Sequence, residues 1–131
     1  MRTLLPPGWA RPSGYANGIE AEGRIIFLAG QIGWLPEGRF EADDFAGQFR
    51  QTLLNILALL AEAEAGPEHV VRMTWFITDI VAYRNSLRDL GAIWRELMGK
   101  NYPAMSVVCV SALVEDKAKI EIEATAVVPH T

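Results

Sequence analysis

The sequence is poor in the residues that bind metals or form disulfides. Of its 131 residues, one is a cysteine and two are histidines. The single cysteine, Cys109, excludes an internal disulfide and is typical of a protein kept in the reducing cytoplasm. We expect it to be buried in a strand, as free cysteines commonly are. His69 and His130 stand far apart, and no group of Cys, His and Asp has metal-ligand spacing, so we predict no metal site.

Basic charge and long apolar runs are scarce as well. Twelve Lys and Arg against sixteen Asp and Glu give a net charge of −4, which offers no basic surface for nucleic acid or an anionic membrane. The longest strongly apolar run, residues 56–61, is far shorter than a membrane span of about 20 residues. The apolar run before Pro6 is too short for a signal peptide. We therefore expect a cytoplasmic protein without nucleic-acid or membrane partners.

Glycines cluster at Gly30-Gln31-Ile32-Gly33, but this segment does not indicate a nucleotide site. It lacks the pattern of a phosphate-binding loop, and no helix follows it directly. Together with the missing metal-ligand spacing, this predicts a protein that works without a cofactor.

The chain length fits one domain over residues 1–131. Residues 1–14 hold three prolines and two glycines, which predicts an irregular lead-in. Hydrophobic periodicity then predicts five strands and two helices. The strands are expected at 15–22, 24–29, 69–78, 105–113 and 119–128, and the helices at about 45–65 and 82–98.

This order, β-β-α-β-α-β-β, indicates an α+β fold whose two helices cover one face of a sheet. The last strand has one apolar and one polar face, with Ile120, Ile122, Ala124 and Ala126 alternating with Lys119, Glu121, Glu123 and Thr125. The strand at 69–78 is less polarised. Val71, Met73, Trp75 and Ile77 share one face, while Val70 and Phe76 lie among Arg72, Thr74 and Thr78 on the other. A second face that is partly apolar favours self-association.

Six segments, taken in order, resemble one known family. They are Gly14-Tyr15, residues 26–32, residues 51–57, residues 70–79, Pro103-Ala104-Met105-Ser106 and residues 119–126. Together they are similar to the YjgF/RidA family, whose members hydrolyse reactive imines and enamines. The resemblance implies the chorismate-mutase-like α+β fold with a mixed sheet. It also implies a homotrimer with small-molecule clefts between neighbouring subunits.

The same resemblance implies a set of site residues. Glu121 matches the glutamate that helps to position the hydrolytic water, and Tyr15, Gly30 and Gln31 match residues of the ligand cleft. Four further positions of the cleft depart from the family pattern. Ala29 replaces a serine, Leu87 an asparagine, Met105 an arginine and Val107 a cysteine.

The change at Met105 bears directly on the substrate. The family arginine clamps a substrate carboxylate, and such a charged bidentate hydrogen bond contributes about 1.5–3 kcal/mol. Methionine prefers apolar or aromatic contacts and cannot replace it. Either the ligand is not a simple 2-imino acid, or Arg11, Arg24 or Arg72 supplies the cation. We favour a larger, less charged ligand, because all four departures replace a polar residue with an apolar one.

Three functions follow as hypotheses from the resemblance. The first is hydrolytic deamination of an imine or enamine other than a simple 2-imino acid. The second is a non-catalytic protein that binds or senses a small metabolite in the same cleft. The third is a ribonuclease or translation inhibitor, against which the acidic net charge argues.

Overall fold

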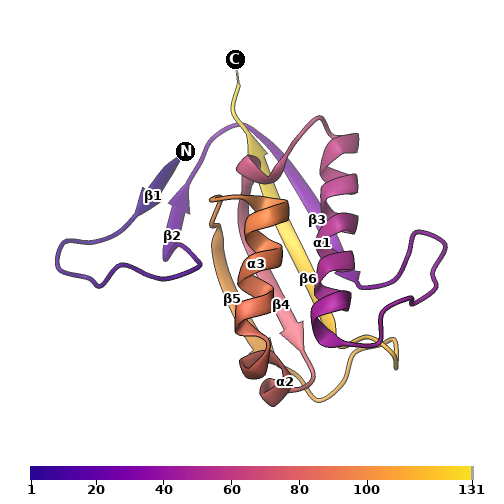
Figure 1. Cartoon of the computed structure of the whole chain (residues 1–131). Helices are drawn as coiled ribbons and strands as arrows, with labels where there is room; N and C mark the ends of the chain where they lie inside the picture. The colour runs from indigo at the N-terminus through magenta and orange to yellow at the C-terminus, as the bar shows by residue number, and fades with distance from the viewer. Residues whose placement is uncertain (131) are drawn as a thin grey trace.

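The computed structural model describes residues 1–130. Its main sheet has four strands in the order β3-β6-β4-β5, in which β4 and β5 run parallel and the other neighbours run antiparallel. The strands are β3 (Arg24–Ile32), β4 (Val70–Ile77), β5 (Ala104–Cys109) and β6 (Ile120–Val128). Strand β5 therefore forms one edge of the sheet, and β3 forms the other (Figure 1).

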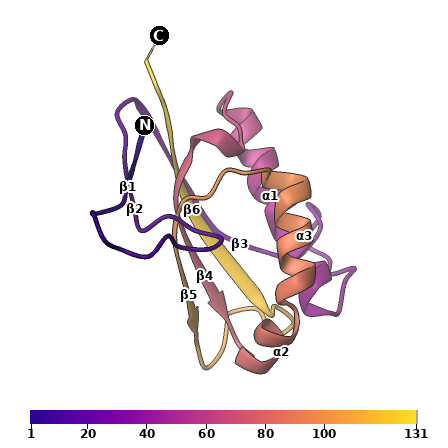
Figure 2. The ribbon, with the colours of Figure 1, turned by 60° about the vertical axis from the view of Figure 1, so that its left-hand side comes forward.

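The two long helices, α1 (Phe45–Glu62) and α3 (Leu87–Met98), cover the same face of this sheet, as Figure 2 shows. Between that face and the helices lies the core, which includes Phe49, Leu53, Ile56, Met73, Ile77, Ile120 and Ile122, all fully buried. The prediction of an α+β fold with a mixed sheet and helices on one face is confirmed. None of the helices in the described chain is long and apolar enough to cross a membrane.

The alternation predicted for the last strand is present in β6. Ile120, Ile122, Ala124 and Ala126 are all buried, while Glu123 is exposed. In β4 the register shifts between Val70 and Arg72, so two residues occupy the space of one. This bulge turns Val70 into the core and leaves Val71 half-buried, the reverse of the prediction for these two residues.

The N-terminal prediction was wrong in part. Strand β1 (Arg2–Leu4) pairs antiparallel with β2 (Gly18–Glu20) as a separate two-stranded sheet, although residues 1–14 were predicted to be irregular. The strand predicted at 15–22 is reduced to β2 and does not pair with β3. Three-residue strands carry too little alternation to be recognised in a sequence.

The second predicted helix is two helices. Asp79 accepts hydrogen bonds from the backbone N–H groups of Val81 and Ala82, both at 3.0 Å, so the first helix begins earlier than predicted. This helix, α2 (Ile80–Asn85), ends at Ser86, where α3 begins in a new direction. A short 3-10 helix, η1 (Pro67–His69), leads into β4.

Strand β3 runs to Ile32, three residues beyond its predicted end at Ala29, with a register shift between Leu28 and Gln31. Helix α1 holds the end of β3 in place, because the side-chain amide of Asn55 on α1 donates to the carbonyl oxygens of Ile32 (3.0 Å) and Trp34 (2.8 Å). Strand β5 ends earlier than predicted, at Cys109. Cys109 is exposed at this sheet edge, so the prediction of a buried cysteine was wrong.

Candidate functional site

A groove of about 600 Å³ runs between helix α3 and the strands β4 and β5. Its volume lies within the range of about 300–1,000 Å³ that is usual for small-molecule sites. The floor comes from the strands and one wall from α3, while the loop at residues 13–15 and Tyr102 close one end. Aromatic side chains are frequent in the lining: Tyr15, Trp75, Tyr83, Trp94 and Tyr102.

Four of the eight predicted site residues lie together in this groove. They are Tyr15, Leu87, Met105 and Val107. Met105 and Val107 alternate along β5 and face the helices, where they pack against the core cluster. Leu87, the first residue of α3, is 53% exposed, so much of its side chain faces the groove and solvent rather than the core.

Tyr15 reaches the groove because the loop that carries it is tied to β5. The Ala16 N–H donates to the Pro103 carbonyl oxygen at 3.0 Å, and Ala16 forms a parallel bridge with Ala104. Tyr102 stacks on Trp94 with ring centroids 6.1 Å apart and 12° between the planes. The Trp94 indole N–H donates to the Asn101 carbonyl oxygen at 3.2 Å, which fixes the wall at this end of the groove.

The other four predicted residues form a second group. Glu121 lies half-buried on β6, and Ala29, Gly30 and Gln31 lie on the neighbouring strand β3. A Cβ atom at Gly30 would overlap the Glu121 carboxylate, so the absence of a side chain at Gly30 lets the carboxylate lie against the β3 backbone. The Gln31 side-chain amide donates to the Ala29 carbonyl oxygen at 3.0 Å. None of these four residues lines the groove of the same chain.

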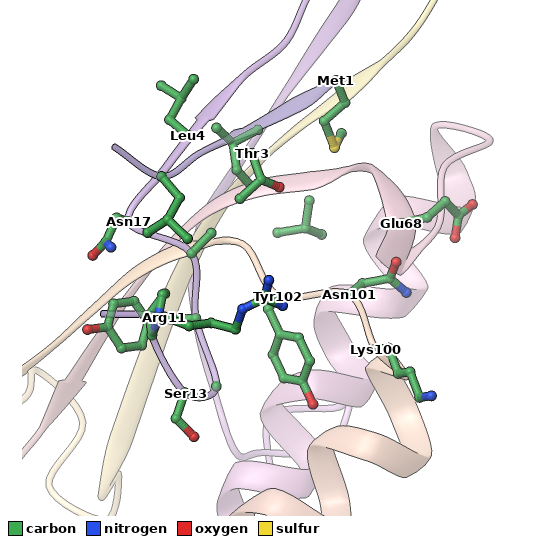
Figure 3. Close-up of a pocket in the computed structure, with 17 residues that line it drawn as sticks. Met1, Thr3, Leu4, Arg11, Ser13, Asn17, Glu68, Lys100, Asn101 and Tyr102 are labelled. Carbon is green, nitrogen blue, oxygen red and sulfur yellow. The ribbon is translucent and has the colours of Figure 1, made fainter. Parts of the chain in front are cut away.

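None of the three arginines predicted as replacement cations lines the groove. Arg24 and Arg72 are exposed on strands β3 and β4. Arg11 lines a neighbouring cavity of about 780 Å³ beneath the β1–β2 hairpin, with Thr3, Glu68, Lys100 and Asn101 (Figure 3). The two cavities share Ser13, Gly14, Tyr15 and Tyr102.

The cation that does line the groove is Arg95, which the sequence reasoning missed. Leu87, Gly91 and Arg95 are spaced by four residues and therefore lie along one side of α3. Once Leu87 was assigned to the cleft, this spacing was a signal that pointed to Arg95. Gly91 and Trp75 are further lining residues that the prediction did not include.

Helix α3 also carries an ion pair outside the groove. The Arg50 guanidinium of α1 donates to Glu96, with Nη1 and Oε1 3.1 Å apart. The hydrogen bond that Arg50 donates to Glu96 lowers the pKa of the Glu96 carboxyl and raises the pKa of the Arg50 guanidinium. Arg95 has no ion-pair partner among residues 1–130. In the same residues no three His, Cys, Asp or Glu side chains are grouped so as to hold a metal ion.

Comparison with known proteins identifies the family. The model of the family Endoribonuclease L-PSP matches residues 10–128. A RutC family protein of Pyrococcus abyssi is 36% identical over 113 residues, which are 86% of this chain and 84% of that protein. The 2-iminobutanoate/2-iminopropanoate deaminase of Escherichia coli is 34% identical over 113 residues, which are 86% of each protein.

Solved structures agree in fold. The Rid family protein YyfB from Yersinia pestis has a TM-score of 0.85 at 30% identity, covering 97% of this chain and 98% of that one. TdcF from Escherichia coli, solved with bound serine, has a TM-score of 0.68 at 30% identity, with the same shares covered. The chain therefore belongs to the YjgF/RidA family, the group whose family model is named Endoribonuclease L-PSP.

Proposed function

We propose that this protein hydrolyses imines or enamines that carry a bulky apolar group, in clefts between the subunits of a homotrimer in the cytoplasm. The observation that carries this proposal is the aromatic groove in which Tyr15, Leu87, Met105 and Val107 come together. A relative that is 34% identical is named for deamination of 2-iminobutanoate and 2-iminopropanoate. The apolar floor at Met105 and Val107 favours a larger substrate than these for the present chain.

The division of the predicted site into two groups supports the trimer. The groove lies at the β5 edge of the sheet, and Glu121 lies beside the opposite edge strand, β3. A cyclic arrangement in which the β5 edge of one subunit meets the β3 edge of the next brings the two groups together. Each cleft then takes its walls from one copy and Glu121, Gly30 and Gln31 from its neighbour.

The open face of the sheet offers an apolar surface for this assembly. Phe27 is 78% exposed and Ile25 58% exposed on β3, and Val108 is exposed on β5. Exposed apolar side chains gathered on one sheet face favour burial against another copy. Light scattering is expected to give a mass three times that of the 14.5 kDa chain. Phe27→Glu is expected to shift the protein towards the monomer, and a trimer that survives this change contradicts the use of this face.

In the proposed reaction Glu121 moves protons and the groove holds the substrate. Glu121 accepts a proton from a water molecule as the water oxygen adds to the C=N carbon, and the imine nitrogen takes up that proton. The C–N bond then breaks, the hydroxyl proton passes through Glu121 to the nitrogen, and the carbonyl product and ammonia leave. General acid–base catalysis of this kind contributes about 10²–10⁴-fold to a rate.

The test generates imines in place with an amino-acid oxidase and measures ammonia release above spontaneous hydrolysis. Glu121→Gln is expected to lower the enzymatic rate by about a hundredfold or more. Glu123→Gln is the matched control, because Glu123 is exposed on the same strand face, and it is expected to retain the wild-type rate. Equal rates in Glu121→Gln and wild type contradict the role of Glu121.

One observation favours a second function, a protein that binds a metabolite without converting it. The groove of a single chain is lined by tyrosines and one arginine but by no carboxylate or histidine that can act as a base. This alternative predicts that ligands raise the melting temperature while no imine is hydrolysed faster than in buffer.

A further inference from the structure

The groove has a charged end and an apolar end. Arg95 lies in the last turn of α3, close in sequence to Tyr102, and Ser13 and Tyr15 also line the groove. The N-terminal end of α3 contributes Leu87, and Val107 continues the apolar surface along β5. A site of this kind fits an elongated ligand with one anionic group and one apolar group.

Arg95 is available to such a ligand. Its side chain is exposed, and it has no ion-pair partner within residues 1–130, whereas Arg50 on α1 is paired with Glu96. Cations are favoured in the last turn of any helix, but that preference does not select the side that faces the groove. A guanidinium binds a carboxylate through two parallel hydrogen bonds, which lysine and neutral donors cannot reproduce.

Gly91 marks the space that the ligand would fill. It lies in the interior of α3, where glycine lowers helix stability by about 1 kcal/mol relative to alanine. A Cβ atom at Gly91 would meet nothing within 4 Å, so no contact inside the described chain requires a glycine there. The open position lies in the groove, four residues before Arg95.

Trp75 forms part of the floor of the groove. Its side chain is 6% exposed and lines the groove floor, and its indole Nε1–H has no hydrogen-bond partner within residues 1–130. The Nε1 atom has almost no exposed surface, so Trp75 offers a ligand in the groove its ring and not its N–H donor. The Trp94 indole, by contrast, is satisfied by Asn101.

We propose that the groove binds aromatic monocarboxylates, with the carboxylate on Arg95 and the aromatic ring over Gly91 and Met105. This inference rests on the proposed function and names its substrate class, 2-imino acids with an aromatic side chain. The stacked pair of Trp94 and Tyr102 and the ring of Trp75 give the ligand's ring flat partners, and aromatic pairs contribute about 0.5–1.5 kcal/mol beyond the area they bury. The cation absent from Met105 on the sheet is thus supplied from the helix.

The test measures binding of three stable probes by calorimetry: 3-phenylpropanoate, its neutral amide 3-phenylpropanamide, and butanoate. The wild-type protein is expected to bind 3-phenylpropanoate about tenfold or more tightly than the amide, the effect of one charge-assisted contact at an exposed site. It is expected to prefer 3-phenylpropanoate to butanoate by about tenfold as well.

Two sets of variants localise the effect. Arg95→Gln is expected to bind the acid and the amide equally, and Arg95→Lys is expected to keep part of the preference for the acid. Arg88→Gln is an exposed control on the same helix and is expected to keep the whole preference. Gly91→Phe fills the groove and is expected to weaken 3-phenylpropanoate at least tenfold. Ala92→Phe is its control, because Ala92 is exposed on the same helix and does not line the groove, and it is expected to keep the wild-type affinity.

The outcomes separate this inference from the deaminase proposal. A full preference for the acid in Arg95→Gln, wild-type affinity in Gly91→Phe, or equal binding of butanoate and 3-phenylpropanoate overturns the inference, even when imines are hydrolysed. If the probes behave as expected and no imine is hydrolysed, the aromatic carboxylate site stands and the deaminase proposal falls.

Discussion

Replacing Gln48 with methionine tests how helix α1 is joined to the strand that carries Glu121. Gln48 is 1% exposed, and its side chain bridges three backbone groups. Its amide donates to the carbonyl oxygens of Ala42 (3.2 Å) and Lys117 (2.9 Å), and its Oε1 accepts from the Lys119 N–H at 2.8 Å. Gln48→Met keeps the length of the side chain and removes all three hydrogen bonds.

The expected loss follows from the number of bonds. A net contribution of about 1 kcal/mol for each bond gives a destabilisation of about 3 kcal/mol. For a chain of this size, about 4 °C in melting temperature corresponds to 1 kcal/mol, so the midpoint is expected to fall by about 12 °C. Wild type and variant are compared at equal protein concentration by calorimetry and urea unfolding, because self-association makes the midpoint depend on concentration.

Gln51→Met is the matched control on the same helix. Gln51 is half-buried and makes one side-chain hydrogen bond, to Asn55 at 3.0 Å, so a loss of about 1 kcal/mol is expected. If Gln48→Met costs no more than Gln51→Met, or stabilises the protein, the bridge from α1 to the start of β6 is not what fixes this part of the fold.

Two further predictions concern contacts that hold the site. Asn55→Ala removes both hydrogen bonds to the end of β3 and is expected to lower the free energy of unfolding in urea by about 2–3 kcal/mol. Amide hydrogen exchange at Gln31 is expected to become faster, and unchanged exchange would contradict an anchoring role for Asn55. Glu96→Gln is expected to lower the melting temperature at neutral pH and to match wild type in acid. Because the hydrogen bond from Arg50 lowers the pKa of Glu96, its stabilisation is complete above the unfolded carboxyl pKa of about 4.3 and is lost as the pH falls through the lower folded value. A difference that persists in acid would contradict this assignment.

The sequence was a good guide where a long, regular pattern determines the structure. The alternation in residues 119–128 predicted the buried face of β6, because a nine-residue strand with one buried face must repeat every two residues. Helix α1 was predicted for the same reason, from apolar residues spaced by three and four. The helix begins after Asp44, whose carboxylate accepts from the Gly47 N–H at 3.0 Å.

The sequence was a poor guide where one contact overrides a pattern. The bulge at Val70 exchanges the faces of two residues, and nothing in the local sequence marks it. The side chain of Asp79 begins α2 ahead of the apolar stripe, and the chain turns at Ser86. Cys109 was predicted to be buried because free cysteines commonly are, but β5 is an edge strand, and the order of strands in a sheet cannot be read from the pattern of one strand.

The candidate site, too, was predicted only in part from the sequence. Of the eight residues predicted to share one cleft, Tyr15, Leu87, Met105 and Val107 lie in one groove of the chain, and the other four do not. Taken alone, the loss of an arginine at Met105 indicated a less charged ligand. Arg95 changes that inference, because a cation on the helix wall compensates for its absence from the sheet and leaves the floor free for an apolar group. Both kinds of site then hold a carboxylate on an arginine, and they differ in where that arginine lies. An arginine at the position of Met105 suits a small 2-imino acid, whereas Arg95 on α3 leaves room on the sheet for an aromatic group.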